Sequence, residues 1–154
     1  MTKFVEYRYD ECGLDNVILR GLPVVTDDEG DEVVTIPNVN LLHRVLMAAV
    51  ASKETGLQPK ELRFLRTELG FTQAELADRV GKDAQTIGRW ERGETPIEKT
   101  AEMVIRARAL ETARVDEFLP MDELARRSVQ SAVQLPFLID ASDPNDYRPV
   151  KLAA

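Results

Sequence analysis

The sequence predicts an α+β protein in three parts: a small N-terminal β region followed by a helix, an all-α domain of five helices, and a short C-terminal extension. Two observations lead to this fold class. Apolar residues alternate in short runs up to Ile36, and from Asn38 onward they recur at helical spacing. Helix-start and helix-stop residues then bracket a series of amphipathic segments. We expect the parts to be residues 1–57, 58–111 and 112–154, with the first boundary near residues 54–59.

Short strands are expected at residues 3–10, 17–19 and 33–36, where apolar and aromatic residues cluster. The segment Gly21-Leu22-Pro23 and the acidic run at residues 26–32 separate them. That acidic run does not place a glycine and a terminal glutamate at EF-hand spacing, so we interpret it as a solvated hairpin turn.

A helix should begin after Asn38, with either Asn38 or Asn40 as its N-cap. One stripe carries its apolar residues, namely Val39, Leu42, Val45, Leu46, Ala49 and Val50. Gly56 is expected to end this helix, and Pro59 to open the next one. His43 has no second histidine or cysteine nearby in the sequence, so we interpret it as a satisfied or exposed histidine.

The first two helices of the all-α domain have clear signals. Residues 60–69 carry leucines on one face and are stopped by Gly70. The second helix begins at Thr72, where the sequence TQAE forms a capping box. Its apolar face is Leu76, Ala77 and Val80, and Gly81 supplies a tight turn.

Three further helices are expected after Gly81. The third starts from the N-cap Asp83 and runs to Arg92, with Ile87 and Trp90 inward and Gly93 as its stop. A second capping box, TPIE at residues 95–98, opens the fourth, whose inward positions are Ile97, Ala101 and Val104. The fifth covers residues 105–110, as a continuation or as a separate helix after a bend.

The string RTELGFTQAELADRVGKDAQTIGRWERGETPI, residues 66–97, resembles the Cro/C1 (xenobiotic-response-element) helix-turn-helix family. The shared pattern is T-Q-x-x-L-A, then a glycine, then I-x-x-W-E-x-G. The resemblance implies an ion pair between Arg66 and Glu91 that joins the first helix to the end of the third. An unpaired guanidinium on the leucine face of the first helix would be costly, which supports this pairing.

Geometry then predicts which side chains meet DNA, because a recognition helix presents its N-terminal, outward residues to the major groove. Gln85 suits adenine and Arg89 suits guanine, whereas small side chains suit a thymine methyl. We interpret Gly88, also expected outward, as a point of close approach to a backbone or a groove. The predicted base contacts are Ala84, Gln85, Thr86 and Arg89. The predicted backbone contacts are Gln73, Lys82, Arg92 and Lys99, of which the three cations are equally well explained as ordinary solvated charges.

Composition limits the functional classes. The net charge of −7 divides into −5 for residues 1–57, +1 for residues 58–110 and −3 for residues 111–154, so an acidic chain still has a DNA-compatible middle. One cysteine excludes an internal disulfide and fits a reducing cytoplasm. We see no signal peptide, no membrane span, and no constellation of residues typical of an enzyme or a cofactor site.

The N-terminal string Tyr7-x-Tyr9-x-x-Cys12-Gly13-Leu14-Asp15-x-Val17 looks like the MqsA-type antitoxin and regulator group. Zinc-bearing members hold paired Cys-x-x-Cys ligands, but only Cys12 remains here. We therefore expect no metal, and interpret Cys12 as a small buried hydrophobe. In the extension, we expect a helix from Pro120 to Val133 and an apolar run at residues 136–139, which packs on the N-terminal domain or forms a dimer surface.

These observations predict a cytoplasmic, dimeric repressor that binds double-stranded operator DNA and needs no cofactor. Two alternatives remain open. One is the antitoxin of a toxin–antitoxin pair, which grips a toxin protein through its N-terminal domain, and the other is a protein-interaction adaptor. Polar side chains at positions 85, 86 and 89 favour DNA over an adaptor.

Overall fold

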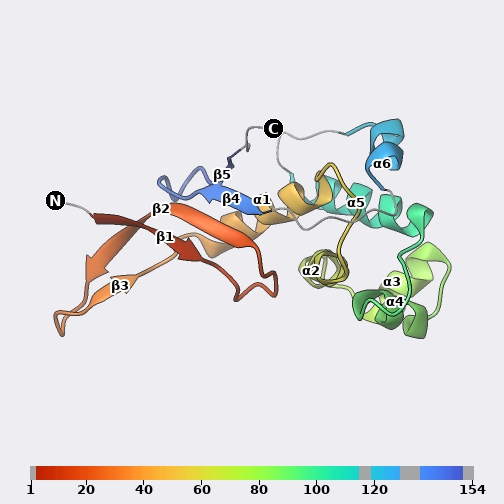
Figure 1. Ribbon diagram of the computed structural model, residues 1–154, viewed down its shortest axis with the longest axis horizontal. Coiled ribbons are helices and arrows are strands. Elements are labelled where there is room, and N and C mark those ends of the chain that lie inside the picture. Colours follow the sequence, from red (N-terminus) through yellow and green to blue (C-terminus); the bar gives the residue numbers. More distant parts are fainter. Residues whose placement is uncertain (1–2, 115–118, 129–135, 151–154) are drawn as a thin grey trace. The chain divides into compact units, whose positions relative to one another are not determined.

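The computed structural model describes residues 3–114, 119–128 and 136–150, which form six helices and five strands (Figure 1). The chain packs as two compact units, Met1–Val45 with Leu135–Ala154, and Leu46–Gln134. The division falls inside a helix, α1 (Val39–Ala51), and not in the linker at residues 54–59. The three expected segments therefore differ from the two compact units, because the C-terminal apolar run belongs to the N-terminal sheet.

The sheet of the first unit consists of β1 (Lys3–Arg8), β2 (Val17–Thr26), β3 (Glu32–Val34), β4 (Phe137–Asp140) and β5 (Arg148–Pro149). Strand β2 is its centre: β1 and β3 pair with it antiparallel, and β4 pairs with it in parallel along residues 17–20. β5 then pairs antiparallel with β4. The apolar run of the extension thus packs on the N-terminal domain as a strand.

Strand β2 continues through the segment that we expected to interrupt it. Gly21 adopts a φ of +77°, and the opposite strand shows a register irregularity between Val5 and Tyr7. A bulge of this kind absorbs one extra residue and lets pairing resume beyond it. The predicted end of the strand at residue 19 was therefore wrong. The acidic run forms the β2–β3 hairpin turn, where the Asp27 carboxylate accepts hydrogen bonds from the backbone N–H groups of Glu29 and Asp31.

The apolar core of this unit differs in part from the expected one. Tyr9 and Val17 are buried, but Tyr7 and Ile18 are only half-buried, and Val34 is exposed. The fully buried side chains are instead Leu14, Val17, Leu19, Leu22, Leu42 and Ile139. Leucines from the loop before β2 and from β2 itself replace the side chains expected from the outer strands.

Helix α1 begins after Asn38, whose carbonyl accepts hydrogen bonds from the N–H groups of Leu41 and Leu42. Asn38 occupies the N-cap position with a φ of +56°, and its side-chain amide donates to the Pro144 carbonyl. The predicted stripe is buried at Leu42, Val45, Leu46 and Val50, but Val39 is exposed.

The second unit contains α2 (Pro59–Glu68), α3 (Gln73–Val80), α4 (Ala84–Glu91) and α5 (Lys99–Ala113). Over residues 59–113, all of which the structure describes, there are four helices and not the expected five. The fourth and fifth expected helices form one continuous α5, since no glycine or proline interrupts residues 99–113.

The expected capping box at residues 95–98 is also absent. α5 begins at Lys99, with Glu98 as an N-cap residue that makes no side-chain capping bond. The Glu98 carboxylate instead accepts a hydrogen bond from Lys82 at 2.8 Å.

The core of the four helices is the set of apolar residues Leu62, Leu65, Leu76, Ala77, Ile87, Trp90, Ala101 and Ile105. Val104, predicted to face inward, is 40% exposed. Residues 101, 105, 109 and 113 form the buried stripe of α5 at a spacing of four, so position 104 lies beside that stripe.

Two charged residues of α5, Glu102 and Arg106, are buried in this core. Arg106 is fully buried and donates hydrogen bonds to Glu102, to the Ser128 hydroxyl and to the backbone carbonyls of Ala51, Lys53 and Thr55. Burial raises the pKa of Glu102, although the Arg106 charge acts to lower it. Burial lowers the pKa of Arg106 from its usual value.

Helix α6 (Met121–Arg127) ends before Ser128, whose backbone is no longer helical. It is shorter than expected, and the remainder of the predicted stretch, residues 129–133, lies outside the described residues. Hydrogen bonds from Arg126 and Arg127 lower the pKa of Glu123 to about 2. None of the described helices is both long and apolar enough to cross a membrane.

Candidate nucleic-acid interface

Local hydrogen bonds fix where α3 and α4 begin. The Thr72 hydroxyl accepts from the Glu75 N–H at 3.1 Å, and the Glu75 carboxylate accepts from the Thr72 N–H at 3.1 Å. At the start of α4, Asp83 accepts from both the N–H and the hydroxyl of Thr86, each at 2.8 Å. The predicted capping box at Thr72 and the predicted N-cap at Asp83 are therefore present, and Gly81 supplies the left-handed turn between the helices.

These caps perturb the carboxylates that form them. Hydrogen bonds from the N–H and then the hydroxyl of Thr72 lower the pKa of Glu75. Hydrogen bonds from the hydroxyl and then the N–H of Thr86 lower the pKa of Asp83. Both carboxylates are therefore ionised at neutral pH and complement the positive N-terminal ends of their helices.

Helix α4 has one buried face and one exposed face. Ile87 is fully buried and Trp90 is 3% exposed, so both anchor the helix to the core. On the opposite side, Gln85 and Arg89 are exposed, while Ala84 and Thr86 are half-buried. The four predicted base-contact residues thus lie together on the first turn and a half of one helix, although the Thr86 hydroxyl is already engaged by Asp83.

Gly88 does not face outward, as the sequence suggested, but is buried. A Cβ atom there would lie 2.9 Å from the Arg92 Nη1 atom and 3.6 Å from both the amide nitrogen and oxygen of Gln73. The glycine provides room for these two side chains at the contact between α3 and α4. This need for space explains why a glycine occurs inside α4, although glycine weakens a helix interior by about 1 kcal/mol.

A hydrogen-bonded group around Glu91 joins α2, α3 and α4. Arg66 donates to the Glu91 carboxylate from Nε at 2.6 Å and from Nη2 at 3.0 Å, and also to the Phe71 carbonyl. Gln73 donates to the same carboxylate at 3.2 Å. The Arg66 and Glu91 side chains are only 14% and 5% exposed. This two-pronged pair fixes the end of α4 relative to α2 and the first turn of α3.

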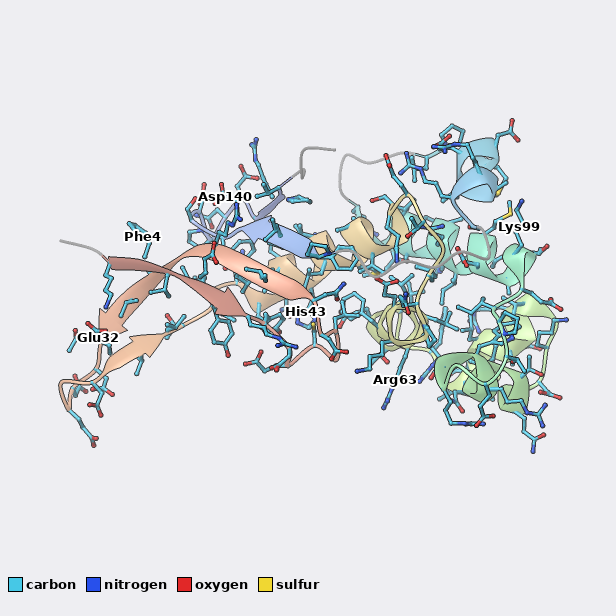
Figure 2. All side chains as sticks on the ribbon, in the orientation of Figure 1. Phe4, Glu32, His43, Arg63, Lys99 and Asp140 are labelled. Carbon is cyan, nitrogen blue, oxygen red and sulfur yellow. The ribbon has the colours of Figure 1, made fainter. Side chains whose placement is uncertain are left out.

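The four predicted backbone contacts have different surroundings. Gln73 is half-buried and held by Glu91, whereas Lys99 is exposed at the first turn of α5 (Figure 2). Lys82 forms an ion pair with Glu98 at 2.8 Å, and Arg92 forms one with Glu94 at 2.8 Å. Two of the four residues, Lys82 and Arg92, are therefore already paired with carboxylates of the same chain.

Arg89 and Lys99 differ from Lys82 and Arg92. Within the part of the chain that the structure describes, the side chains of Arg89 and Lys99 form no hydrogen bond or ion pair, although the charges of Asp83 and Glu94 act on Arg89. Arg89 is the exposed cation on the helix face that carries the other predicted base contacts.

Residues 62–106, which span from α2 into α5, match the helix-turn-helix family model. The predicted Cro/C1-type helix-turn-helix is confirmed for this segment. That family consists of DNA-binding regulator domains and not of enzymes. No curated protein and no solved structure matches the chain.

Sequence reasoning missed the carboxylates beside the helix-turn-helix cations. Glu94 follows Arg92 by two positions, and outside a helix or strand this spacing does not predict that two side chains pair. Glu98 lies sixteen positions after Lys82, and only the fold brings the two together.

Cys12 and His43 each contact Tyr9 in the first unit, at different ends of that residue. The Tyr9 hydroxyl and His43 Nε2 are 2.6 Å apart, and the Cys12 thiol donates to the Tyr9 carbonyl at 3.8 Å. Cys12, which we expected to be a small buried hydrophobe, is half-buried. Among the described residues, no group of three or more His, Cys, Asp or Glu side chains is arranged to hold a metal ion.

Proposed function

We propose that the protein is a dimeric transcriptional repressor that reads a palindromic operator through α4. The observation that carries this proposal is the pair Gln85 and Arg89, exposed on the face of α4 opposite its buried Ile87 and Trp90. They lie inside a segment that matches a DNA-binding family, on the second helix of the helix-turn-helix. In that geometry the N-terminal residues of the second helix contact base edges.

The chemistry of the exposed residues suits the major groove. Arg89 offers two parallel N–H donors, which match the O6 and N7 acceptors of guanine. Gln85 offers one donor and one acceptor, which match the N6 and N7 atoms of adenine. Ala84 and the Thr86 methyl suit a thymine methyl. Each helix-turn-helix thus reads only a few base pairs, so two copies on half-sites about one helical turn apart would supply the specificity of an operator.

The test begins with a duplex selected from a random pool by the purified protein, and a duplex of the same length with shuffled sequence. Arg89→Ala is expected to weaken binding to the selected duplex by about 1–3 kcal/mol and to relax preference at one base pair. Arg108→Ala removes the same charge from α5 without touching α4, and should bind both duplexes within about twofold of the parent. Unchanged affinity of Arg89→Ala for the selected duplex would remove α4 from the reading surface.

The backbone contacts should behave differently. Lys82→Ala is expected to weaken the selected and shuffled duplexes to a similar degree, and to reduce the dependence of affinity on salt by about one unit of slope. A loss confined to the selected duplex would contradict a phosphate role for Lys82.

A second candidate function is capture of a basic toxin protein by the first unit, as in an autoregulated toxin–antitoxin operon. It is favoured by one surface feature: Phe4 and Val25 are 57% and 48% exposed on a unit whose β2–β3 turn is acidic (Figure 2). Exposed apolar residues on a unit with an acidic turn are typical of a surface that binds a basic protein. Co-purification of a toxin encoded beside the gene, lost in Phe4→Asp, would support this function, and retention of the toxin by Phe4→Asp would contradict it.

A further inference from the structure

Two carboxylates lie where the helix-turn-helix would meet the DNA backbone. Glu98, the residue before α5, accepts a hydrogen bond from Lys82 in the turn before α4. Glu94, just after α4, accepts two hydrogen bonds from Arg92, from Nε at 2.8 Å and from Nη2 at 3.3 Å. Both pairs are exposed to solvent, with side-chain exposures of 31% and 53% for Lys82 and Glu98, and 58% and 52% for Arg92 and Glu94.

The Arg92–Glu94 pair has a defined place against the fold. The Arg92 Nη1 atom lies over Gly88, at 2.9 Å from the position that a Cβ would take, and the Gln73 amide lies 3.6 Å from the same position. The carboxylate therefore holds the guanidinium against α4, where a DNA phosphate is expected. The hydrogen bond from Arg92 lowers the pKa of Glu94, so the carboxylate is charged throughout the physiological range.

Two of the three predicted backbone cations, Lys82 and Arg92, form ion pairs with carboxylates. The side chains of Lys99 and of Arg89, the predicted base reader, form none with the residues that the structure describes, although Asp83 and Glu94 act on Arg89 electrostatically. A carboxylate beside a cation competes directly with a phosphate for the same N–H donors. The arrangement therefore weakens two contacts with the DNA backbone, those of Lys82 and Arg92, and leaves the donors of Arg89 without a hydrogen-bonded carboxylate.

We propose that Glu94 and Glu98 act as internal competitors of DNA phosphate and set the sequence-independent part of the affinity. This inference rests on the proposed DNA-binding function. Binding requires Arg92 and Lys82 to exchange a carboxylate for a phosphate. Each phosphate contact therefore contributes less binding free energy than it would with an unpaired cation. Selectivity stays with Gln85 and Arg89, because the exchange is the same on any duplex.

The test is a comparison of Glu94→Gln, Glu98→Gln and the double variant with the parent, by fluorescence anisotropy on the selected and shuffled duplexes over 50–300 mM KCl. Each single variant should bind both duplexes up to about fivefold tighter, because an exposed ion pair contributes up to about 1 kcal/mol. The slope of log affinity against log salt should steepen with each carboxylate removed. The ratio of the two affinities should change less than twofold.

Glu111→Gln is the matched control, since Glu111 also forms an exposed ion pair, with Arg108 near the end of α5. It changes the net charge by the same amount and should leave both affinities within twofold of the parent. Thermal melting of each variant shows whether the loss of charge at Glu98, the residue before α5, alters folding.

The outcomes separate the inference from the proposed function. If the parent binds DNA and the glutamine variants bind no more tightly, or if Glu111→Gln tightens binding equally, the competitor role is wrong and DNA binding stands. If the parent binds neither duplex, the proposed function and this inference both fail.

Discussion

Replacing Arg106 by methionine tests the most unexpected feature of the second unit, a buried guanidinium at the centre of a polar group. Arg106 is fully buried, and its five hydrogen-bond acceptors come from the end of α1, the following loop, α5 and the residue after α6. Methionine has a similar length and no donors. The variant Arg106→Met therefore keeps most of the packing and leaves the Glu102 carboxylate buried without its cation.

The expected loss follows from these contacts. Removing one partner of a buried ion pair costs about 3–5 kcal/mol, because the other charge is left uncompensated. The double variant Arg106→Met/Glu102→Leu removes that charge as well, and apolar replacement of a whole buried pair is often close to neutral. The carbonyls that Arg106 served would still lack donors, at about 1–3 kcal/mol for each one that water does not reach. We expect the double variant to recover about half of the loss.

Urea unfolding followed by the fluorescence of Trp90, the chain's one tryptophan, measures these free energies in the unit concerned. pH supplies a second test. Burial raises the folded-state pKa of Glu102, so protonation of Glu102 stabilises the folded state. This stabilisation is complete below the unfolded pKa of about 4.3 and is lost as pH rises through the folded pKa. The difference in free energy of unfolding between the single and double variants should therefore become smaller from pH 8 to pH 5. A loss below about 1 kcal/mol for Arg106→Met, or equal losses for the two variants, would refute this account.

Three further predictions concern the rest of the molecule. Analytical ultracentrifugation should find two chains on a palindromic duplex, and a stable one-to-one complex on a full site would count against a dimer. Elemental analysis should find no stoichiometric zinc, and a chelator should leave the melting temperature unchanged; chelator-induced unfolding would show ligands that we did not recognise. Because capping lowers the folded pKa of Asp83, its stabilisation is present above the unfolded value of about 3.9 and is lost as pH falls through the folded pKa. Asp83→Asn, which also caps well, should therefore lose less stability than the parent between pH 5 and pH 3, and an identical acid transition would contradict this.

The parts of the fold that the sequence predicts well are those set by neighbouring residues. The caps at Thr72 and Asp83 and the stop at Gly81 depend on contacts within four positions, and all three are present. The exposed face of α4 also follows from local periodicity, since burying Ile87 and Trp90 turns Gln85 and Arg89 outward. This is why the helix-turn-helix and the exposed face of α4 were predictable from one sequence.

The parts that it misses depend on distant contacts. The parallel pairing of β2 with β4 joins residues 17–20 to residues 137–140, and no local pattern specifies it. On α5, spacings of three and four are both helical, so Val104 and Ile105 were equally good candidates for the buried face. In the structure Ile105 is buried, and so is the next residue, Arg106, a residue type that is rarely found in a core.

Glu98 shows how a local signal and a distant contact compete for one side chain. In the sequence it completes a capping box with Thr95, but in the structure its carboxylate binds Lys82. A cap is worth about 1 kcal/mol and an exposed ion pair up to about 1 kcal/mol, so local preference alone cannot decide between them. In the structure the ion pair forms and the capping box does not, and α5 begins at Lys99 without a side-chain cap. The same choice places a negative charge beside Lys82, just before α4, so the detail that the sequence misassigned is also one on which the proposed competition with DNA phosphate depends.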